Sequence, residues 1–137
     1  MKRLFLAGLL SLACLVPAGA ADSPVKSTPV LSTTKTAIGQ PIVLPSTDPQ
    51  VVVTLLEIAP GAKLPRHKHP FQRYGYVMQG EVTVEYEGGQ RQTFRTGDFI
   101  VEAIGVWHFG TNTGTVPLKL LVIDQVEAGK SNTILPN

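Results

Sequence analysis

The stretch GAKLPRHKHPFQRYGYVMQG, residues 61–80, contains two of the three histidines of the chain, His67 and His69. Residues two apart on a strand project from the same face, so both imidazoles are expected to point into one interior. His108 can complete a facial set of three metal ligands if it lies on another strand. A lone H-x-H pair is often solvent-facing or structural, so the spacing by itself leaves those alternatives open.

A second stretch, GDFIVEAIGVWHFGTN at residues 97–112, places His108 in a matching context. Together the two stretches resemble the two motifs of the cupin family. The first motif is glycine, five residues, H-x-H, three residues, glutamate, six residues and glycine. The second is glycine, five residues, P-x-G, two residues, histidine, three residues and asparagine. The matching positions are Gly61, His67, His69, Gly80, Gly97, Gly105, His108 and Asn112, and the resemblance covers about residues 40 to 127.

This resemblance implies an all-β fold, the double-stranded β-helix or jelly-roll barrel of the cupins. It also implies that His67, His69 and His108 line the barrel and hold one divalent transition metal ion, which in the family is commonly iron, manganese, nickel, copper or zinc. Imidazole suits most first-row metals, so the histidines do not select one. The family further leads us to expect a homodimer.

Two motif positions depart from the family pattern. Ala103 stands where proline is usual, and Arg73 stands where the family has a glutamate ligand, which changes the expected site. Three interpretations follow. In the first, three histidines bind the metal, open positions remain, and Arg73 clamps an anionic group of the substrate. In the second, Gln72 or Glu102 supplies the missing oxygen; Glu102 could also pair with Arg73 or act as a general base. In the third, the barrel holds no metal and binds an anion directly.

From these interpretations we take Glu102 as the candidate catalytic residue and Arg73 with Gln72 as the candidate substrate-binding residues. Lys63, Arg66 and Lys68 precede Arg73 within a short stretch, which favours an anionic ligand. Strand alternation places Lys68 opposite the histidines, on the outer surface. A solvated loop with scattered charge is the alternative reading of these cations.

The pattern beyond the motifs predicts strands and no helix. Short apolar runs alternate with glycine, proline, asparagine and aspartate, and residues 82–86 alternate with period two before a Gly88-Gly89 turn. Such runs indicate a β-sandwich or barrel. They lie at residues 42–44, 51–58, 74–78, 81–86, 91–94, 99–103 and 118–122.

The first twenty residues are typical of a secretory signal: Lys2 and Arg3, an apolar run, then small residues before a cleavage site near Ala20. We therefore expect a signal peptide at 1–20, a flexible arm at 21–38, a cupin barrel at 39–130 and a tail at 131–137. The product would be periplasmic or secreted; anchoring as a lipoprotein through Cys14 is the less favoured alternative. Without Lys2 and Arg3 the basic and acidic residues are equal in number, which is not the charge of a nucleic-acid-binding protein.

The leading functional hypothesis is a small exported metalloenzyme that binds or transforms a small anionic organic molecule, of oxygenase, isomerase or decarboxylase type. The alternative is a periplasmic ligand-binding or sensing cupin without turnover, and a third is a barrel in which the metal is purely structural. No G-x-S-x-G motif and no phosphate-binding glycine loop occurs, which argues against a serine hydrolase or a P-loop enzyme. Fold analogy alone does not select a reaction.

Overall fold

The computed structural model describes residues 24–137, and the expected signal peptide at 1–20 lies outside this part of the chain. The described residues form seven strands and no helix, so the all-β prediction is confirmed. The strands are β1 (Pro49–Ile58), β2 (Gln72–Gln79), β3 (Glu81–Tyr86), β4 (Arg91–Arg95), β5 (Phe99–Val101), β6 (His108–Asn112) and β7 (Leu118–Glu127). Within residues 24–137, no helical segment is available to cross a bilayer.

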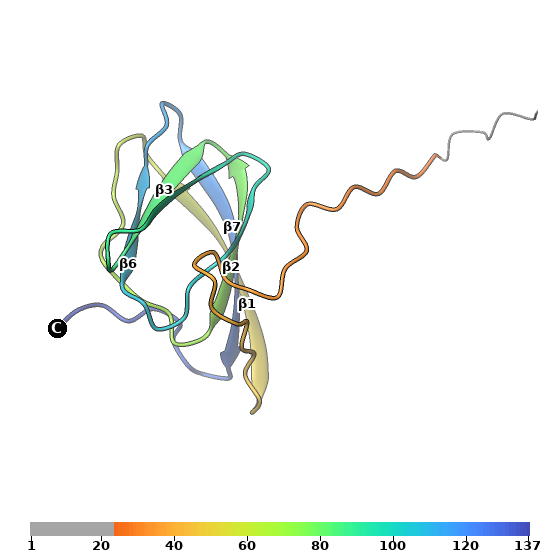
Figure 1. Cartoon of the computed structure of the whole chain (residues 1–137), viewed down its shortest axis with the longest axis vertical. Coiled ribbons are helices and arrows are strands. Elements are labelled where there is room, and N and C mark those ends of the chain that lie inside the picture. The colour runs from red at the N-terminus through yellow and green to blue at the C-terminus, as the bar shows by residue number, and fades with distance from the viewer. Residues whose placement is uncertain (1–23) are drawn as a thin grey trace, which may run out of the picture.

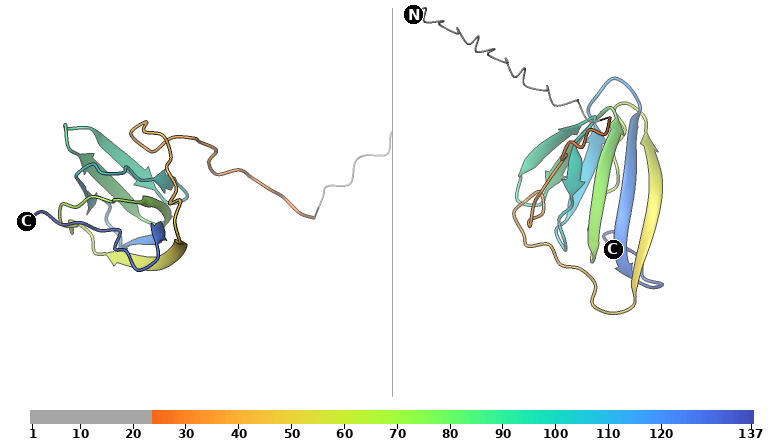
Figure 2. Two further views of the ribbon diagram at one scale, coloured as in Figure 1. Left: turned by 90° about the horizontal axis from the view of Figure 1, so that it is seen from below. Right: turned by 90° about the vertical axis from the view of Figure 1, so that its right-hand side faces the viewer.

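The strands form two antiparallel sheets that face each other across one interior (Figure 1, Figure 2). The larger sheet has the order β1-β7-β2-β5 and the smaller has the order β4-β3-β6. The chain crosses from one sheet to the other after β2, β4, β5 and β6, so that β2 and β5 lie side by side in one sheet and β3 and β6 in the other. This is the jelly-roll arrangement, in which two motifs far apart in sequence meet inside the barrel.

The core lies between the sheets, and β7 shows how the sequence builds it. Its residues alternate between buried and half-buried along the whole strand. The inward side chains of Leu118, Leu120 and Val122 join the core cluster with Val77 and Val82. Burial of each such side chain stabilises the fold by about 1.5–3 kcal/mol, which fixes the register of β7 between β1 and β2.

The turn between β2 and β3 depends on Gly80. Its φ of 86° lies in the left-handed region, and a Cβ here would approach both Leu118 Cα and Pro117 O at 3.1 Å. Both facts require glycine, because a side chain would be strained by the backbone and crowded by the start of β7. Gly80, the second glycine of the first motif, therefore has a structural role, which is to allow the tight turn from β2 into β3.

Two segments differ from the predicted strands, and two terminal segments pack on the barrel. Residues 42–44 form no strand, and the sequence reading had no strand at His108–Asn112, where β6 runs with a glycine at its centre. Part of the arm is packed on the barrel: Thr36 is buried and the Ala37 amide donates to Val101 O at 2.7 Å. The C-terminal segment is packed as well, since Asn132 is buried and Ile134 pairs with Lys68 through two backbone hydrogen bonds.

Candidate metal centre

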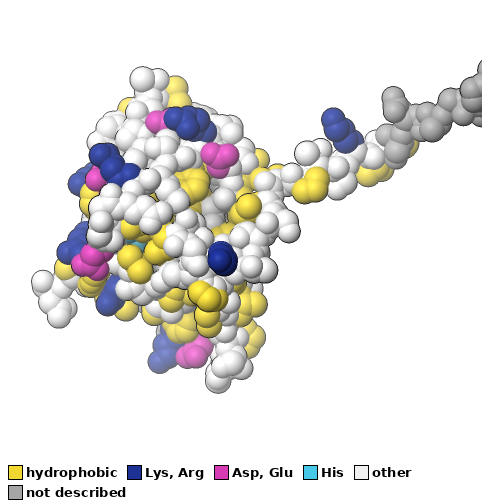
Figure 3. Space-filling model, in the orientation of Figure 1, with side chains coloured by type: hydrophobic (Ala, Val, Ile, Leu, Met, Phe, Trp, Pro, Cys, Tyr) yellow, Lys and Arg dark blue, Asp and Glu magenta, His cyan; other side chains and the backbone are white. Residues whose placement is uncertain are grey.

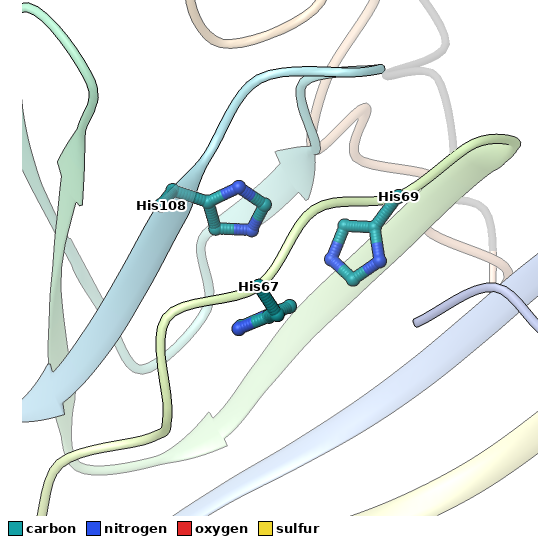
Figure 4. Close-up of side chains that lie close together, drawn as sticks. All are labelled: His67, His69 and His108. Carbon is teal, nitrogen blue, oxygen red and sulfur yellow. The ribbon is translucent and has the colours of Figure 1, made fainter. Parts of the chain in front are cut away.

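The three histidines converge from two neighbouring segments, the one that leads into β2 and the start of β6 (Figure 4). His67 and His69 lie on the extended segment that leads into β2, and His108 is the first residue of β6. Two backbone hydrogen bonds of 2.9 and 2.8 Å join His67 and His108 directly. The pairing of these backbones, together with the two-residue spacing of His67 and His69, brings all three side chains to one point.

All three imidazoles are buried, with exposed fractions of 8% for His67, 0% for His69 and 3% for His108. Figure 3 accordingly shows almost no histidine surface. The ring centroids are 4.5 to 4.9 Å apart, and one ligand atom from each ring lies within 4.8 Å of the others. Buried imidazoles this close are costly unless something satisfies their inward nitrogens.

Each ring makes a hydrogen bond through Nδ1 to a backbone carbonyl. His67 donates to Pro65 O at 2.7 Å, His108 to Val106 O at 2.9 Å and His69 to Asn132 O at 2.5 Å. These bonds place the proton on Nδ1 and leave the Nε2 lone pairs pointing inward, which is the usual arrangement of metal-binding histidines. The buried Nε2 atoms of His69 and His108 have no hydrogen-bond partner among the described residues. The donor set therefore fits a divalent transition metal ion.

A carboxylate also reaches this point. Glu102 follows β5, and its Oε2 lies 3.2 Å from Nε2 of both His69 and His108. Atoms bound to one ion at about 2.1 Å lie about 3.0–3.4 Å apart when they are neighbours in its coordination shell. Glu102 is thus placed as a fourth ligand would be.

The electrostatics of the cluster are strongly coupled. Burial, reinforced by the charges of the other two histidines, lowers the pKa of His67 to about 4, so this ring is neutral at pH 7. Burial also opposes the charge of His108, but the contact with Glu102 outweighs it and raises the pKa of His108. The same contacts with His108 and His69 lower the pKa of Glu102, despite its burial, and keep it anionic.

Arg73 lies at the rim of the cluster and does not pair with Glu102. Its Nε and Nη2 donate to Asp124 Oδ1 and Oδ2 at 2.7 and 2.9 Å, a bidentate ion pair across the neighbouring strands β2 and β7. The sequence left open an ion pair between Glu102 and Arg73. In the structure the partner of Arg73 is Asp124 instead. This leaves the Glu102 carboxylate to the histidines.

Gln72 is also placed differently from the expectation. It is fully buried, and its Nε2 donates to the backbone oxygens of Arg73 and Glu102 at 2.9 and 3.0 Å. Alternation along β2 turns it away from the face that carries Arg73, and it does not line the cavity beside the histidines. Gln72 therefore joins β2 to the segment of Glu102 through its Nε2, while its buried Oε1 has no hydrogen-bond partner among the described residues.

The other three cations of the basic stretch lie outside the barrel against aromatic rings. Lys63 Nζ is 3.5 Å from the centroid of Phe109, and Lys68 Nζ is 4.6 Å from that of Trp107. Arg66 also lies over Trp107, at 5.3 Å, and pairs with an exposed glutamate. Only Arg73 faces the site, so the density of positive charge in this stretch overstates the charge that a ligand would meet.

The interior space beside the histidines is small and mostly apolar. A cavity of about 40 Å³ is lined by His67, His108, Glu102 and Arg73 at its polar side and by leucine, valine and isoleucine elsewhere. A wider cleft of about 210 Å³ adjoins it, and the two share Leu56, Leu64, His67 and Arg73. The histidines line none of the three larger clefts, which are two of about 370 and 260 Å³ beneath the N-terminal arm and one of about 300 Å³ beside Pro70 and Phe71.

Sequence reasoning missed Asp124 and Asn132. Asp124 had a signal, since it is the one charged residue among the inward positions of an otherwise apolar, alternating β7. Asn132 had none, because its contacts depend on which segments meet in space. The structure brings together five of the residues expected at the site, which are His67, His69, His108, Glu102 and Arg73.

A double-sheet barrel with a buried histidine cluster defines the cupin class. The family model described as the Cupin domain matches residues 54–124, more than half of the chain. The chain therefore belongs to the cupin family. A cupin-domain-containing oxidoreductase, virC of Hypocrea virens, is 29% identical over 72 residues, which are 51% of this chain and 37% of that protein.

Solved structures show the same fold. An oxalate oxidase in complex with the substrate analogue glycolate is 26% identical, with a TM-score of 0.54, over 62% of this chain and 45% of that chain. The oxalate decarboxylase of Lactobacillus farciminis, in a formate complex, is also 26% identical, with a TM-score of 0.55, over 62% of this chain and 26% of that chain. A conserved Klebsiella pneumoniae protein with a double-stranded β-helix domain is 22% identical, with a TM-score of 0.55, over 85% of this chain and 95% of that chain. The chain thus spans less than half the length of the two oxalate enzymes and of the curated relative.

Proposed function

We propose that this cupin is a metal-dependent enzyme that acts on a small organic acid, with a metal centre made of three histidines and Glu102. The observation that carries the proposal is the position of Glu102 Oε2, 3.2 Å from the buried Nε2 atoms of His69 and His108. In this proposal the carboxylate that the family pattern places at position 73 is supplied from position 102. The chain thereby keeps an anionic ligand and gains a cation at the rim.

The described residues would have the following roles. His67, His69, His108 and Glu102 would hold the ion, which as a Lewis acid polarises a bound oxygen atom of the substrate. Glu102 is anionic beside two imidazoles, which suits a carboxylate that would hold the ion, and its lowered pKa makes it a weak proton acceptor. The apolar lining of the cavity excludes water and strengthens these electrostatic contacts.

Two features support a small acid as substrate. Arg73 lines both the inner cavity and the outer cleft, and although its Nε and Nη2 are held by Asp124, the N–H groups of Nη1 would remain to donate to a carboxylate in the cleft. The inner cavity of about 40 Å³ accommodates only a few atoms, so the rest of a ligand would stay in the cleft. The oxalate enzymes with a similar fold act on a small dicarboxylic acid, which agrees with this class.

The test is a screen of the purified chain loaded in turn with manganese, iron, nickel, copper and zinc. Oxalate and other small mono- and dicarboxylic acids would be offered, with release of CO₂, uptake of O₂ and isomerisation measured separately. We expect turnover with at least one metal and its loss in Glu102→Gln. Tight binding of an acid with no turnover under any metal would instead support the ligand-binding role.

We also propose that the chain is exported through a signal peptide at residues 1–20. The support is the order of Lys2 and Arg3, an apolar run and the small residues before Ala20. Expression of the full chain in a bacterium should give a periplasmic product that begins near Ala21 by mass spectrometry. A membrane-bound product released by Cys14→Ser would support the lipoprotein alternative.

A homodimer is the assembly that we propose for the barrel. Its support is a row of exposed apolar residues on β1, where Val51, Val53 and Leu55 are 60%, 58% and 67% exposed. A two-fold contact through this row would cover the same patch on both copies. Light scattering should give the mass of two chains, and Val53→Lys should give the mass of one.

A further inference from the structure

The three histidines differ in how their rings are held. The Nδ1 acceptors of His67 and His108 lie two residues earlier in their own segments, at Pro65 and Val106. The acceptor of His69 is Asn132 O, 63 residues away and beyond the last strand. Two of the rings are therefore oriented by local backbone, while the third is oriented by the C-terminal segment.

We propose that Asn132 is a positioning residue of the metal centre, which fixes the orientation and tautomer of His69 and also holds the ion pair at the rim of the site. The inference rests on the metal site proposed above. It assigns residues 131–135, which the sequence led us to expect in a tail at 131–137, to the residues that support the site. Asn132 touches no metal or substrate and would act through His69 and Asp124.

The side chain of Asn132 anchors the carbonyl that His69 uses. Its Oδ1 accepts the Phe71 amide proton at 2.8 Å, and its Nδ2 donates to Asp124 Oδ1 at 2.6 Å. Only this orientation of the amide satisfies both contacts, because the reverse would face oxygen to carboxylate and NH₂ to N–H. Asn132 is only 6% exposed, so these bonds are shielded from water.

The side chain of Asn132 is also connected to Arg73, through Asp124. Asp124 Oδ1 accepts from both Asn132 and Arg73, while Arg73 also contacts Thr133 Oγ1 at 3.4 Å. The C-terminal segment thus contacts a histidine ligand on one side and the rim cation on the other. Displacing it would loosen both at once, and residues that hydrogen-bond to metal ligands commonly contribute about 10–100-fold to metal affinity.

Asn112 offers a matched control within the same chain. It is also a buried asparagine whose amide links separate segments, with Nδ2 donating to Ile58 O and Val116 O at 2.9 Å each. Asn112 makes no hydrogen bond to a histidine of the cluster, to Asp124 or to Arg73. Loss of either amide should destabilise the barrel, but only loss of Asn132 should act on the metal site.

The experiment compares the full chain with Asn132→Ala, Asn112→Ala and the exposed neighbour Ser131→Ala. Zinc affinity is measured by competition with a chelator, and thermal unfolding is measured without metal. We expect Asn132→Ala to bind zinc about tenfold more weakly or worse, and both controls to stay within about threefold of wild type. Proton NMR of the zinc-loaded, ¹⁵N-histidine-labelled chain should show faster exchange of the Nδ1 proton of His69 alone.

Unchanged zinc affinity and three unchanged Nδ1 protons in Asn132→Ala would overturn the proposal, as would an equal loss of affinity in Asn112→Ala. If Asn132→Ala does not fold, Asn132→Asp keeps the acceptor for Phe71 but sets a carboxylate against Asp124. This variant should also lose affinity by about fivefold or more, and unchanged affinity would overturn the proposal. Failure of the wild-type chain to bind zinc or any other first-row metal would instead remove the metal site itself.

Discussion

The inward and outward faces of residues 63–73 have opposite characters although they alternate along one short segment. His67, His69 and Arg73 face the interior, where they meet Glu102 and Asp124. The cations on the outer face stack on aromatic rings or pair with an exposed glutamate. Residue type alone would assign all the cations to one ligand-binding patch, whereas the fold gives only one of them to the site.

The comparison shows that the burial of a side chain, and not the number of charged residues in its segment, determines which residues can take part in metal or ligand binding. A charge in the interior must be matched by a partner, and a change there leaves an unpaired group behind. A charge on the surface is screened by water and contributes little. Matched substitutions on the two faces therefore give sharply different results.

The largest effect is expected for His67→Ala compared with Lys68→Ala. The first removes a ligand from the interior, and the second removes an outward cation next to it in sequence. Metal affinity should fall by more than about 100-fold in the first and stay within about twofold in the second. Competition with a chelator measures the zinc affinity of both variants. An equal affinity in the two would show that the inward and outward faces do not differ in metal binding.

A smaller loss is expected for Glu102→Gln compared with Glu87→Gln. Both remove one negative charge, but Glu102 lies 3.2 Å from two imidazoles and Glu87 pairs with Arg66 on the surface. We expect about 10–100-fold weaker metal binding in Glu102→Gln and no change in Glu87→Gln. Undiminished affinity in Glu102→Gln would reduce the metal centre to three histidines.

Arg73→Ala should lower the stability of the metal-free protein more than Arg66→Ala. It leaves Asp124, only 6% exposed, without its cation, although Asn132 still donates to it. The free energy of unfolding should fall by about 2 kcal/mol, against less than about 1 kcal/mol for the exposed Arg66 pair. Urea unfolding measures both values, and similar losses would show that the two ion pairs are equivalent.

The protons released by metal binding give a pH-dependent test. Glu102 raises the pKa of His108, so His108 keeps its proton to a higher pH, and the ion must displace it. Metal affinity should therefore fall as the pH is lowered, because protons compete for the ligand. Glu102→Gln removes the cause of the raised pKa and should release fewer protons near neutral pH. Calorimetry in buffers of different ionisation enthalpy counts them, and an equal count in both proteins would contradict the coupling.

The smallest effect is expected for the outer cations. Lys63→Ala removes a contact of 3.5 Å with the Phe109 ring, which at an exposed site contributes about 0.5–1 kcal/mol. Thermal unfolding should show this loss without any change in metal affinity. A marked loss of metal binding would mean that the outer face contributes to the site.

The sequence was sufficient to predict the barrel and the histidine cluster, because alternation and motif spacing are local properties. His67, His69 and His108 are brought together by the strand pairing that the two motifs imply. The partners of Arg73 and Gln72 were not predictable, since they depend on the register of β2 against its neighbours. Asn132 was beyond prediction for the same reason, as a loop residue with no periodic signal contacts a ligand 63 residues earlier.

The central claim, that the interior face of this barrel is a metal centre, is tested most directly by elemental analysis of the purified protein. The analysis would be made on the wild-type chain and on the double variant His67→Ala/His108→Ala, with circular dichroism to show that both are folded. The wild type should carry close to one equivalent of a transition metal per chain, and the folded double variant should carry almost none. Equal metal content in the two proteins, or no metal in the wild type even after loading, would contradict the claim.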